Sequence, residues 1–344
     1  MRRRGTRAAG TVARLSGMPH ARRPLPSRLG VAFRYSDARA AGVSRKRLRA
    51  RDLEAPYRGV RRRVDDAPAP AAGPLARDRA VREAVVRDAR AYLQVMVGHA
   101  FFSGRTAAVL HGLPVAHGDE LEVAVFAPKR ALRRAGIRGR KVAPGFARVV
   151  TIDGMRVADP ASCWAMLGGT LGERELIRLG DAIVRIPRGP GGRPQPERQL
   201  ATLAELRAAA SVPGRSGRAR LLHALARIRV GSMSPLETDA RLEEVDAGLP
   251  EPELDVEIRD RSGRLVGIAD QRFAAYHVLV EVEGDHHRTD RAQWQRDIEK
   301  VAAYAGEGYE TVRLVAAQVR AHPGRGIALI RDALLRGGWS PEHS

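Results

Sequence analysis

Three carboxylates toward the C-terminal end of the chain have a type and spacing that suit metal chemistry. Ten residues separate Asp270 from Glu281, and Glu283 follows two positions later. Residues two apart on a strand point to the same face, so the two glutamates should lie together. Carboxylates at close range raise one another's pKa or recruit a cation. Mg²⁺ prefers oxygen ligands and usually keeps room for waters and phosphate oxygens. The sequence therefore predicts a magnesium site, with Mn²⁺ as a substitute.

The segment around these carboxylates predicts a helix followed by an antiparallel meander. Ser234 is a good N-cap, Pro235 suits the first helical position, and Glu237 lies in the first turn. Three short alternating runs follow, separated by turn residues at 260–263 and by a second short turn. The aspartate lies near the end of the second run, and the two glutamates close the third. We therefore expect the carboxylates to meet where neighbouring strands end.

The stretch VLVEVEGDHHRTDRAQWQRDIEKVAAYAGEGYETVRL, with the opening SPLET, resembles the PD-(D/E)XK restriction-endonuclease-like superfamily, in the branch related to very-short-patch repair endonucleases. The resemblance covers about 110 residues, from Ser234 to the end of the chain. It implies an α/β nuclease domain with a central mixed sheet. It also implies metal ligation by Asp270 and Glu281, completed by the Val282 carbonyl, and functional roles for Glu237 and His287.

One position departs from the pattern of that superfamily. The third motif residue is classically a lysine that stabilises the attacking water or the developing phosphate charge, whereas this chain has Glu283, and related repair-type members also place an acid there. The cationic role then passes to another residue, and we expect His287 to take it. The other candidates for this role are His286, Arg296 and Lys300. Asp297, on the helix that follows, is expected to orient His287 or a metal-bound water.

A basic segment near the start of the chain predicts a DNA-binding fold. In FRYSDARAAGVSRKRLRARDLEAPYRGVRRRV, apolar residues around Gly42 indicate a helix-turn-helix, with Ser44 capping the recognition helix. Pro56 ends that helix, and residues 57–64 form a basic wing. The run GVSRKRLR followed by DLEAPYRGV is similar to the winged-helix domain of abortive-infection antitoxins. The alternative is a small helical domain with solvated arginines. The expected DNA contacts are Arg45, Lys46, Arg47, Arg49, Arg58, Arg61 and Arg62.

The distribution of charge supports a nucleic-acid partner. The chain has 60 Lys and Arg against 39 Asp and Glu, a net charge of +21. Residues 234–344 hold 14 cationic and 21 acidic residues, net −7, so residues 1–233 carry +28. Polyanions are the natural partners of such a surface, although GC-rich coding also raises the arginine content. The segregation favours a front half that holds nucleic acid and a back half that gathers carboxylates for cations.

Length and composition predict several folded domains in one chain of 344 residues, 44% of them hydrophobic. The expected organisation is a disordered basic arm at 1–28, a winged-helix domain at 29–66, a Pro/Ala linker at 67–74, a middle α+β domain of unknown role at 75–230 and the nuclease-like domain at 231–344. The middle domain contains no catalytic motif. A long helix from residue 75 to about 97 and a strand at 121–127 are expected in it.

Cysteine usage and hydropathy predict a cytoplasmic protein. The single cysteine, Cys163, excludes an intrachain disulfide and fits a reducing compartment. No apolar run reaches the ~18 to 20 residues of a membrane span, and the Arg-rich start lacks the apolar core of a secretion signal. We therefore expect no membrane partner.

The predicted function is that of a Mg²⁺-dependent endonuclease that hydrolyses phosphodiester bonds in DNA and is targeted by its winged helix. The alternative is a DNA-binding transcriptional regulator, or antitoxin-like protein, whose nuclease-fold domain is catalytically inactive. Three carboxylates in register favour the nuclease, because a repressor has no need of them. The sequence leaves open the target, DNA against RNA, nicking against double-strand cleavage, homodimer formation, and any toxin–antitoxin, repair or defence partner.

Overall fold

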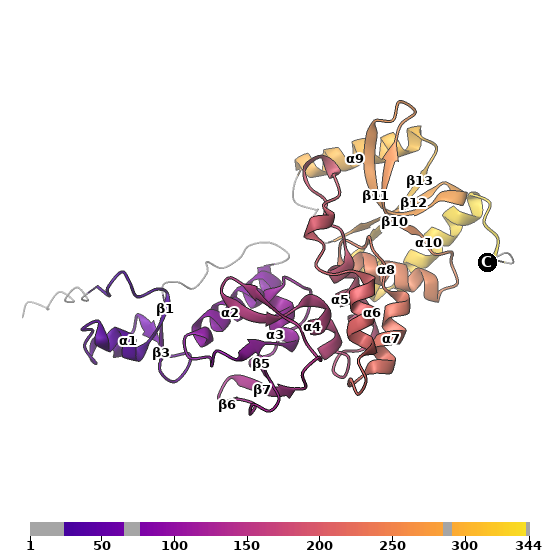
Figure 1. The fold of residues 1–344 in the computed structure, drawn as a ribbon. Coiled ribbons are helices and arrows are strands. Elements are labelled where there is room, and N and C mark those ends of the chain that lie inside the picture. Colours follow the sequence, from indigo (N-terminus) through magenta and orange to yellow (C-terminus); the bar gives the residue numbers. More distant parts are fainter. Residues whose placement is uncertain (1–23, 65–75, 285–290, 342–344) are drawn as a thin grey trace, which may run out of the picture.

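The computed structural model describes residues 24–64, 76–284 and 291–341, without the side chains of residue 77 and residues 291–298. These residues form a mixed α/β structure with three sheets (Figure 1). The expected linker at 67–74 lies outside the described residues, as does most of the expected arm at 1–28. Of that arm, Leu25 is described and packs against the N-terminal core. No described helix is long and apolar enough to cross a membrane.

A three-stranded antiparallel sheet in the order β1-β3-β2 forms the N-terminal part. Its elements are β1 (Ala32–Arg34), α1 (Tyr35–Ala40), β2 (Leu53–Glu54) and β3 (Val60–Arg63). The prediction of a recognition helix after Ser44 is wrong. Only a three-residue 3-10 helix, η1 (Arg47–Arg49), forms there, and the Ser44 hydroxyl accepts from the backbone N–H of Arg47 at 3.1 Å. Because Leu48 is the single large apolar residue of 45–51, that run has no apolar stripe to hold a longer helix on the core.

A six-stranded mixed sheet in the order β6-β7-β5-β4-β9-β8 forms the middle of the chain. Its strands are β4 (Ala100–Phe102), β5 (Leu121–Phe126), β6 (Arg133–Arg134), β7 (Ile137–Val142), β8 (Val149–Ile152) and β9 (Met155–Ala158). The helices are α2 (Ala76–Leu93), α3 (Gly104–Leu110), α4 (Pro160–Met166), α5 (Glu173–Val184), α6 (Leu203–Ser211) and α7 (Arg218–Arg227), with short 3-10 turns η3 (Pro190–Gly192) and η4 (Pro196–Arg198). The expected long helix and the strand at 121–127 are confirmed as α2 and β5.

A four-stranded mixed sheet in the order β10-β11-β12-β13 forms the C-terminal part. Its elements are α8 (Pro235–Asp246), β10 (Glu253–Arg259), β11 (Leu265–Phe273), η5 (Ala274–Tyr276), β12 (Val278–Glu283), α9 (Arg291–Gly306), β13 (Glu310–Val315), the π-helix η7 (Ala317–Ala321) and α10 (Pro323–Arg336). The antiparallel meander is confirmed as β10, β11 and β12, and β13 adds parallel to β12 through the crossover helix α9. Ser234 caps α8, since its hydroxyl accepts from the backbone N–H of Glu237 at 3.2 Å.

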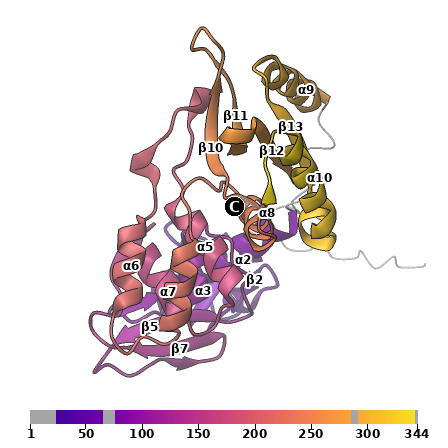
Figure 2. The ribbon, with the colours of Figure 1, turned by 90° about the vertical axis from the view of Figure 1, so that its right-hand side faces the viewer.

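Helix α8 joins the middle and C-terminal parts. Leu242 is buried in the core of the middle part, whereas Leu236 and Ala240 belong to the core under the C-terminal sheet. Ion pairs cross the same junction, because α5 places Arg174 beside Glu243 and Asp246 of α8. In both views the helices α5 to α8 lie between the two larger sheets (Figures 1 and 2).

Candidate active site

Asp270 lies where strands β11 and β12 stop pairing. The ladder runs from Phe273↔Val278 to Gln271↔Val280 and goes no further toward the end of β12. The backbone N–H of Val282, no longer bonded to β11, donates to the Asp270 carboxylate at 2.7 Å instead. The divergence of the two strands thus places an aspartate at their fork.

Glu281 lies on β12 at the same fork. Its Oε2 accepts a hydrogen bond from the ammonium group of Lys300 on α9 at 2.9 Å. Its other oxygen, Oε1, is buried and accepts no hydrogen bond of good geometry from a described residue, although the Tyr304 hydroxyl interacts with this carboxylate. A carboxylate oxygen that is removed from water and left without a donor is destabilising unless a cation or a proton occupies it.

Burial and mutual repulsion disfavour the charged forms of these groups. Burial, followed by the charge of Asp270, raises the pKa of Glu281 to about 7. Burial also raises the pKa of Asp270. The Val282 N–H and Lys300 oppose this effect, because both favour the charged form of Asp270. In α8, burial and then Asp270 raise the pKa of Glu237 to about 8. The three carboxyl groups therefore share one electrostatic environment.

Glu237 faces this environment from the first turn of α8. Its side chain is buried, and its Oε2 accepts from the backbone N–H of Met233 at 2.7 Å. The structure thus brings Glu237, Asp270 and Glu281 together electrostatically. Even so, no group of three or more His, Cys, Asp or Glu residues among the described residues is arranged to hold a metal ion.

Glu283 has a different environment from the one we expected. Its carboxylate forms an ion pair with Arg313 on the neighbouring strand β13. Its charge still contributes to the raised pKa values of Asp270 and Glu281. Glu283 is therefore near the fork but has a partner of its own.

Four of the candidates that accompany these carboxylates are not placed by the structure. His286 and His287 fall outside the described residues, and Arg296 and Asp297 belong to α9 without described side chains. No contact of the Val282 carbonyl with another site residue is described. Lys300 is the one candidate for the cationic role whose side chain is described, and it contacts Glu281 directly.

Three further residues at this site were missed at the level of sequence. Asp255 of β10 adopts a positive φ of 53°, and its charge acts on Asp270 and on Glu237. Arg188, from the middle part of the chain, donates to both of its carboxylate oxygens at 2.8 Å. Tyr304 is fully buried, and burial together with Glu281 raises the pKa of its hydroxyl far above the usual range. Tyr304 was detectable, because it lies one helical turn beyond Lys300. Arg188 was not, because it precedes Asp255 by 67 positions in the chain.

The expected DNA-binding cations fall into two groups. Arg45, Lys46, Arg49 and Arg58 are exposed. Arg47 instead forms a bidentate ion pair with Asp52, and Arg61 donates to the Leu48 carbonyl at 2.8 Å. Arg62 is buried between Glu54 and Asp88, at 2.6 Å from each. Three of the seven cations therefore hold the N-terminal part together.

Comparison with known proteins gave no match that bears on the family or function of the chain. No protein-family model and no curated protein matched this chain.

Proposed function

We propose that this chain is a metal-dependent endonuclease acting on DNA, with its catalytic centre at Asp270 and Glu281. One observation carries the proposal: two partly buried, repelling carboxylates converge at the β11–β12 fork, and Lys300 contacts one of them. The order helix, antiparallel meander, crossover helix and parallel strand from α8 to α10 is compatible with a restriction-endonuclease-like domain. We also propose that the exposed cations Arg45, Lys46, Arg49 and Arg58 of the N-terminal part contact DNA without a recognition helix, and we assign residues 75–230 to a middle domain of unknown role.

The donor set fits Mg²⁺, with Mn²⁺ as a substitute. Asp270 and Glu281 offer only oxygen, and Glu281 Oε1 accepts no hydrogen bond of good geometry from a described residue. Two carboxylates, joined by the Val282 carbonyl, suffice for Mg²⁺ because it usually keeps waters and substrate oxygens as its other ligands. A bound Mg²⁺ supplies an activated water and neutralises charge on the scissile phosphate.

Side chains of the protein would then stabilise the negative charge on the substrate and exchange protons with water. Lys300, fixed by Glu281, presents an ammonium group beside the phosphate and takes the cationic role that the motif gives to its lysine. Glu237, with a pKa near 8, holds a proton at neutral pH that it can exchange with water at the fork. His287 remains a second candidate for the cationic role, and Arg188 positions Asp255 beside these groups.

The test is cleavage of supercoiled plasmid with Mg²⁺ or Mn²⁺ and with EDTA. We expect nicked or linear product that depends on the metal and is lost in Asp270→Ala. Asp332→Ala is the matched control, because it removes one exposed carboxylate from α10, away from the fork. Intact plasmid with the folded wild-type chain, or equal cleavage by Asp270→Ala, contradicts the proposal.

A DNA-binding regulator with an inactive nuclease fold is the second candidate. The observation that favours it is the pairing of Glu281 with Lys300 and of Glu283 with Arg313, which neutralises two of the acids without any metal. Retained DNA binding without cleavage under any divalent cation would select this function.

A further inference from the structure

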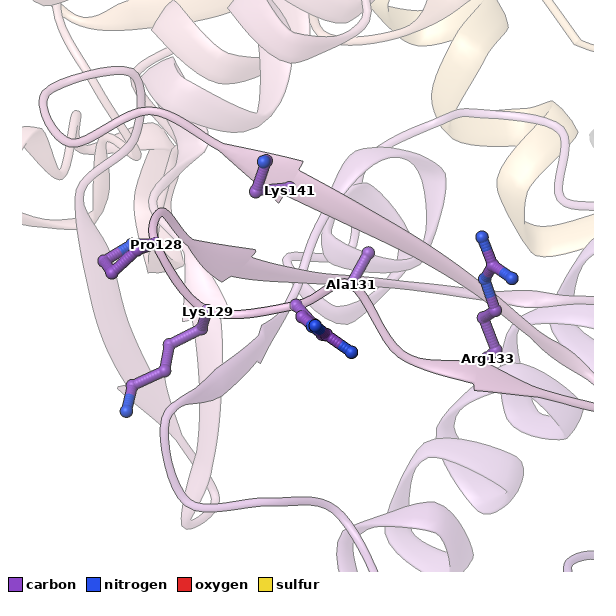
Figure 3. Close-up of a pocket in the computed structure, with 6 residues that line it drawn as sticks. Pro128, Lys129, Ala131, Arg133 and Lys141 are labelled. Carbon is purple, nitrogen blue, oxygen red and sulfur yellow. The ribbon is translucent and has the colours of Figure 1, made fainter.

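A basic hollow lies at the edge of the middle sheet, in a region to which the sequence assigned no role. It has a volume of about 560 Å³ and is lined by Pro128, Lys129, Arg130, Ala131, Arg133 and Lys141. Figure 3 shows Lys129 on the loop after β5, Arg133 on β6 and Lys141 on β7. Strand β6 is the edge strand of the six-stranded sheet, so the hollow is at the surface.

The cations of the hollow are not neutralised within the described chain. Four of its six lining residues are Lys or Arg, none is acidic, and all four are exposed. None of the four forms an ion pair with a described acidic residue. By contrast, their neighbour Arg138 on β7 pairs with Glu120 at 3.1 Å. Like charges gathered at one surface raise the local concentration of anions.

A close backbone contact shapes this hollow. Gly139 of β7 lies so near the preceding loop that a Cβ atom there would be 1.9 Å from the carbonyl oxygen of Leu132. No side chain fits at that separation without movement of the loop. Gly139 therefore permits the loop carrying Lys129 and Arg130 to lie against β7, and thus beside Lys141.

The lining also indicates which anion the hollow suits. Pro128 and Ala131 are its only apolar residues, and no aromatic ring is available to stack on a base. Small-molecule sites are usually lined mainly by apolar and aromatic side chains. Exposed cations without base-reading groups are typical of contacts to phosphate.

We propose that this hollow binds phosphate groups of a DNA backbone, as a contact surface additional to the N-terminal segment. The choice of DNA rests on the proposed function, whereas the preference for phosphate rests on the hollow itself. Two to four neutralised phosphates would release a corresponding number of counterions and make binding depend on salt.

The test measures binding of the full chain to a 20-base-pair duplex in EDTA, by fluorescence anisotropy across salt concentrations. Because no divalent cation is present, the result does not depend on whether the chain cleaves DNA. We expect K129E/R130E to weaken binding by roughly 10-fold or more and to lower the salt slope by about two. The control R207E/R218E makes the same charge change at exposed positions of α6 and α7 and should bind as the wild type does.

Two further arms test the shape of the hollow and the source of the phosphate. Gly139→Ala changes no charge but displaces the loop, so it should also weaken binding. Tripolyphosphate should compete with the duplex only at concentrations far above those of DNA. Unchanged affinity in K129E/R130E overturns the proposal, as does tight tripolyphosphate binding that these substitutions abolish while duplex binding persists.

Discussion

A buried carboxylate in the middle part of the chain, Asp181, and the partly buried carboxylates at the β11–β12 fork differ in what neutralises them. Asp181 of α5 accepts hydrogen bonds from Arg241, from the Thr238 hydroxyl and from the backbone N–H of Arg229, at 2.9, 2.9 and 2.8 Å. At the fork, Glu281 accepts one hydrogen bond of good geometry, from Lys300, and its buried Oε1 has only the Tyr304 hydroxyl to interact with among the described residues.

The difference separates an acid that holds the fold from acids available for chemistry. Asp181 joins α5 to α8 and to the residues before it; burial raises its pKa, and the donors Arg241, Arg229 and Thr238 oppose that by stabilising its charged form. At the fork, the charge of Asp270 raises the pKa of both Glu281 and Glu237, and these are the acids of the proposed metal site. Buried charge with a full set of donors indicates a structural role, and buried charge without one indicates a functional site.

The largest expected effect is on stability, and it concerns Asp181. Asp181→Ala leaves Arg241 buried without its main partner and should lower the free energy of unfolding by about 3–5 kcal/mol. Asp270→Asn keeps an oxygen for the Val282 N–H and removes repulsion, so in metal-free buffer it should leave stability unchanged or raise it. Urea denaturation of both variants checks this pair. If Asp270→Asn lowered the free energy of unfolding more than Asp181→Ala does, Asp270 would have the structural role that we assign to Asp181.

The next effect is on cleavage and concerns Lys300. Lys300→Met removes the ammonium group that faces Glu281 and should reduce the rate by about 100-fold, as expected for a lost charged donor at the reacting phosphate. Lys300→Arg should retain part of the rate. Single-turnover cleavage of a labelled duplex measures both variants. If Lys300→Met cleaves like the wild type, the cationic role belongs elsewhere, and His287 becomes the leading candidate.

A third effect is the dependence of stability on pH. The folded-state pKa values of Glu281, about 7, and Glu237, about 8, lie above the ordinary glutamate value of 4.5. Their contribution to stability is therefore fully present below about pH 4.5 and is lost as the pH rises through 7 to 8. Metal-free melting temperatures should fall between pH 5.5 and pH 8.5, and the fall should be smaller in E237Q/E281Q. If the melting temperature fell equally in wild type and in E237Q/E281Q, Glu237 and Glu281 would not be the cause of the pH dependence.

The sequence predicted the C-terminal part better than the N-terminal part, for physical reasons. Alternating runs and a capped helix are local signals, so the meander and the cap at Ser234 could be predicted from neighbouring residues. The recognition helix could not, because Arg47 and Leu48 satisfy their contacts in a short turn. For the cationic role, the resemblance pointed to His287, which lies outside the described residues, so that prediction stays open. Helix α9 brings the other candidate, Lys300, to Glu281 from 19 residues away.

Calorimetric titration of the full chain with Mn²⁺ at pH 7.5 tests most directly whether the carboxylates at the fork form a metal site. A metal site at the fork should bind Mn²⁺ in wild type with release of protons, because Glu281 and Glu237 are partly protonated at that pH. The release is seen as a heat that varies with the ionisation enthalpy of the buffer. Binding should be lost in Asp270→Asn and retained in Asp332→Asn. Equal affinity of wild type and Asp270→Asn for Mn²⁺, or no binding by wild type at millimolar Mn²⁺, would contradict a metal site at the fork.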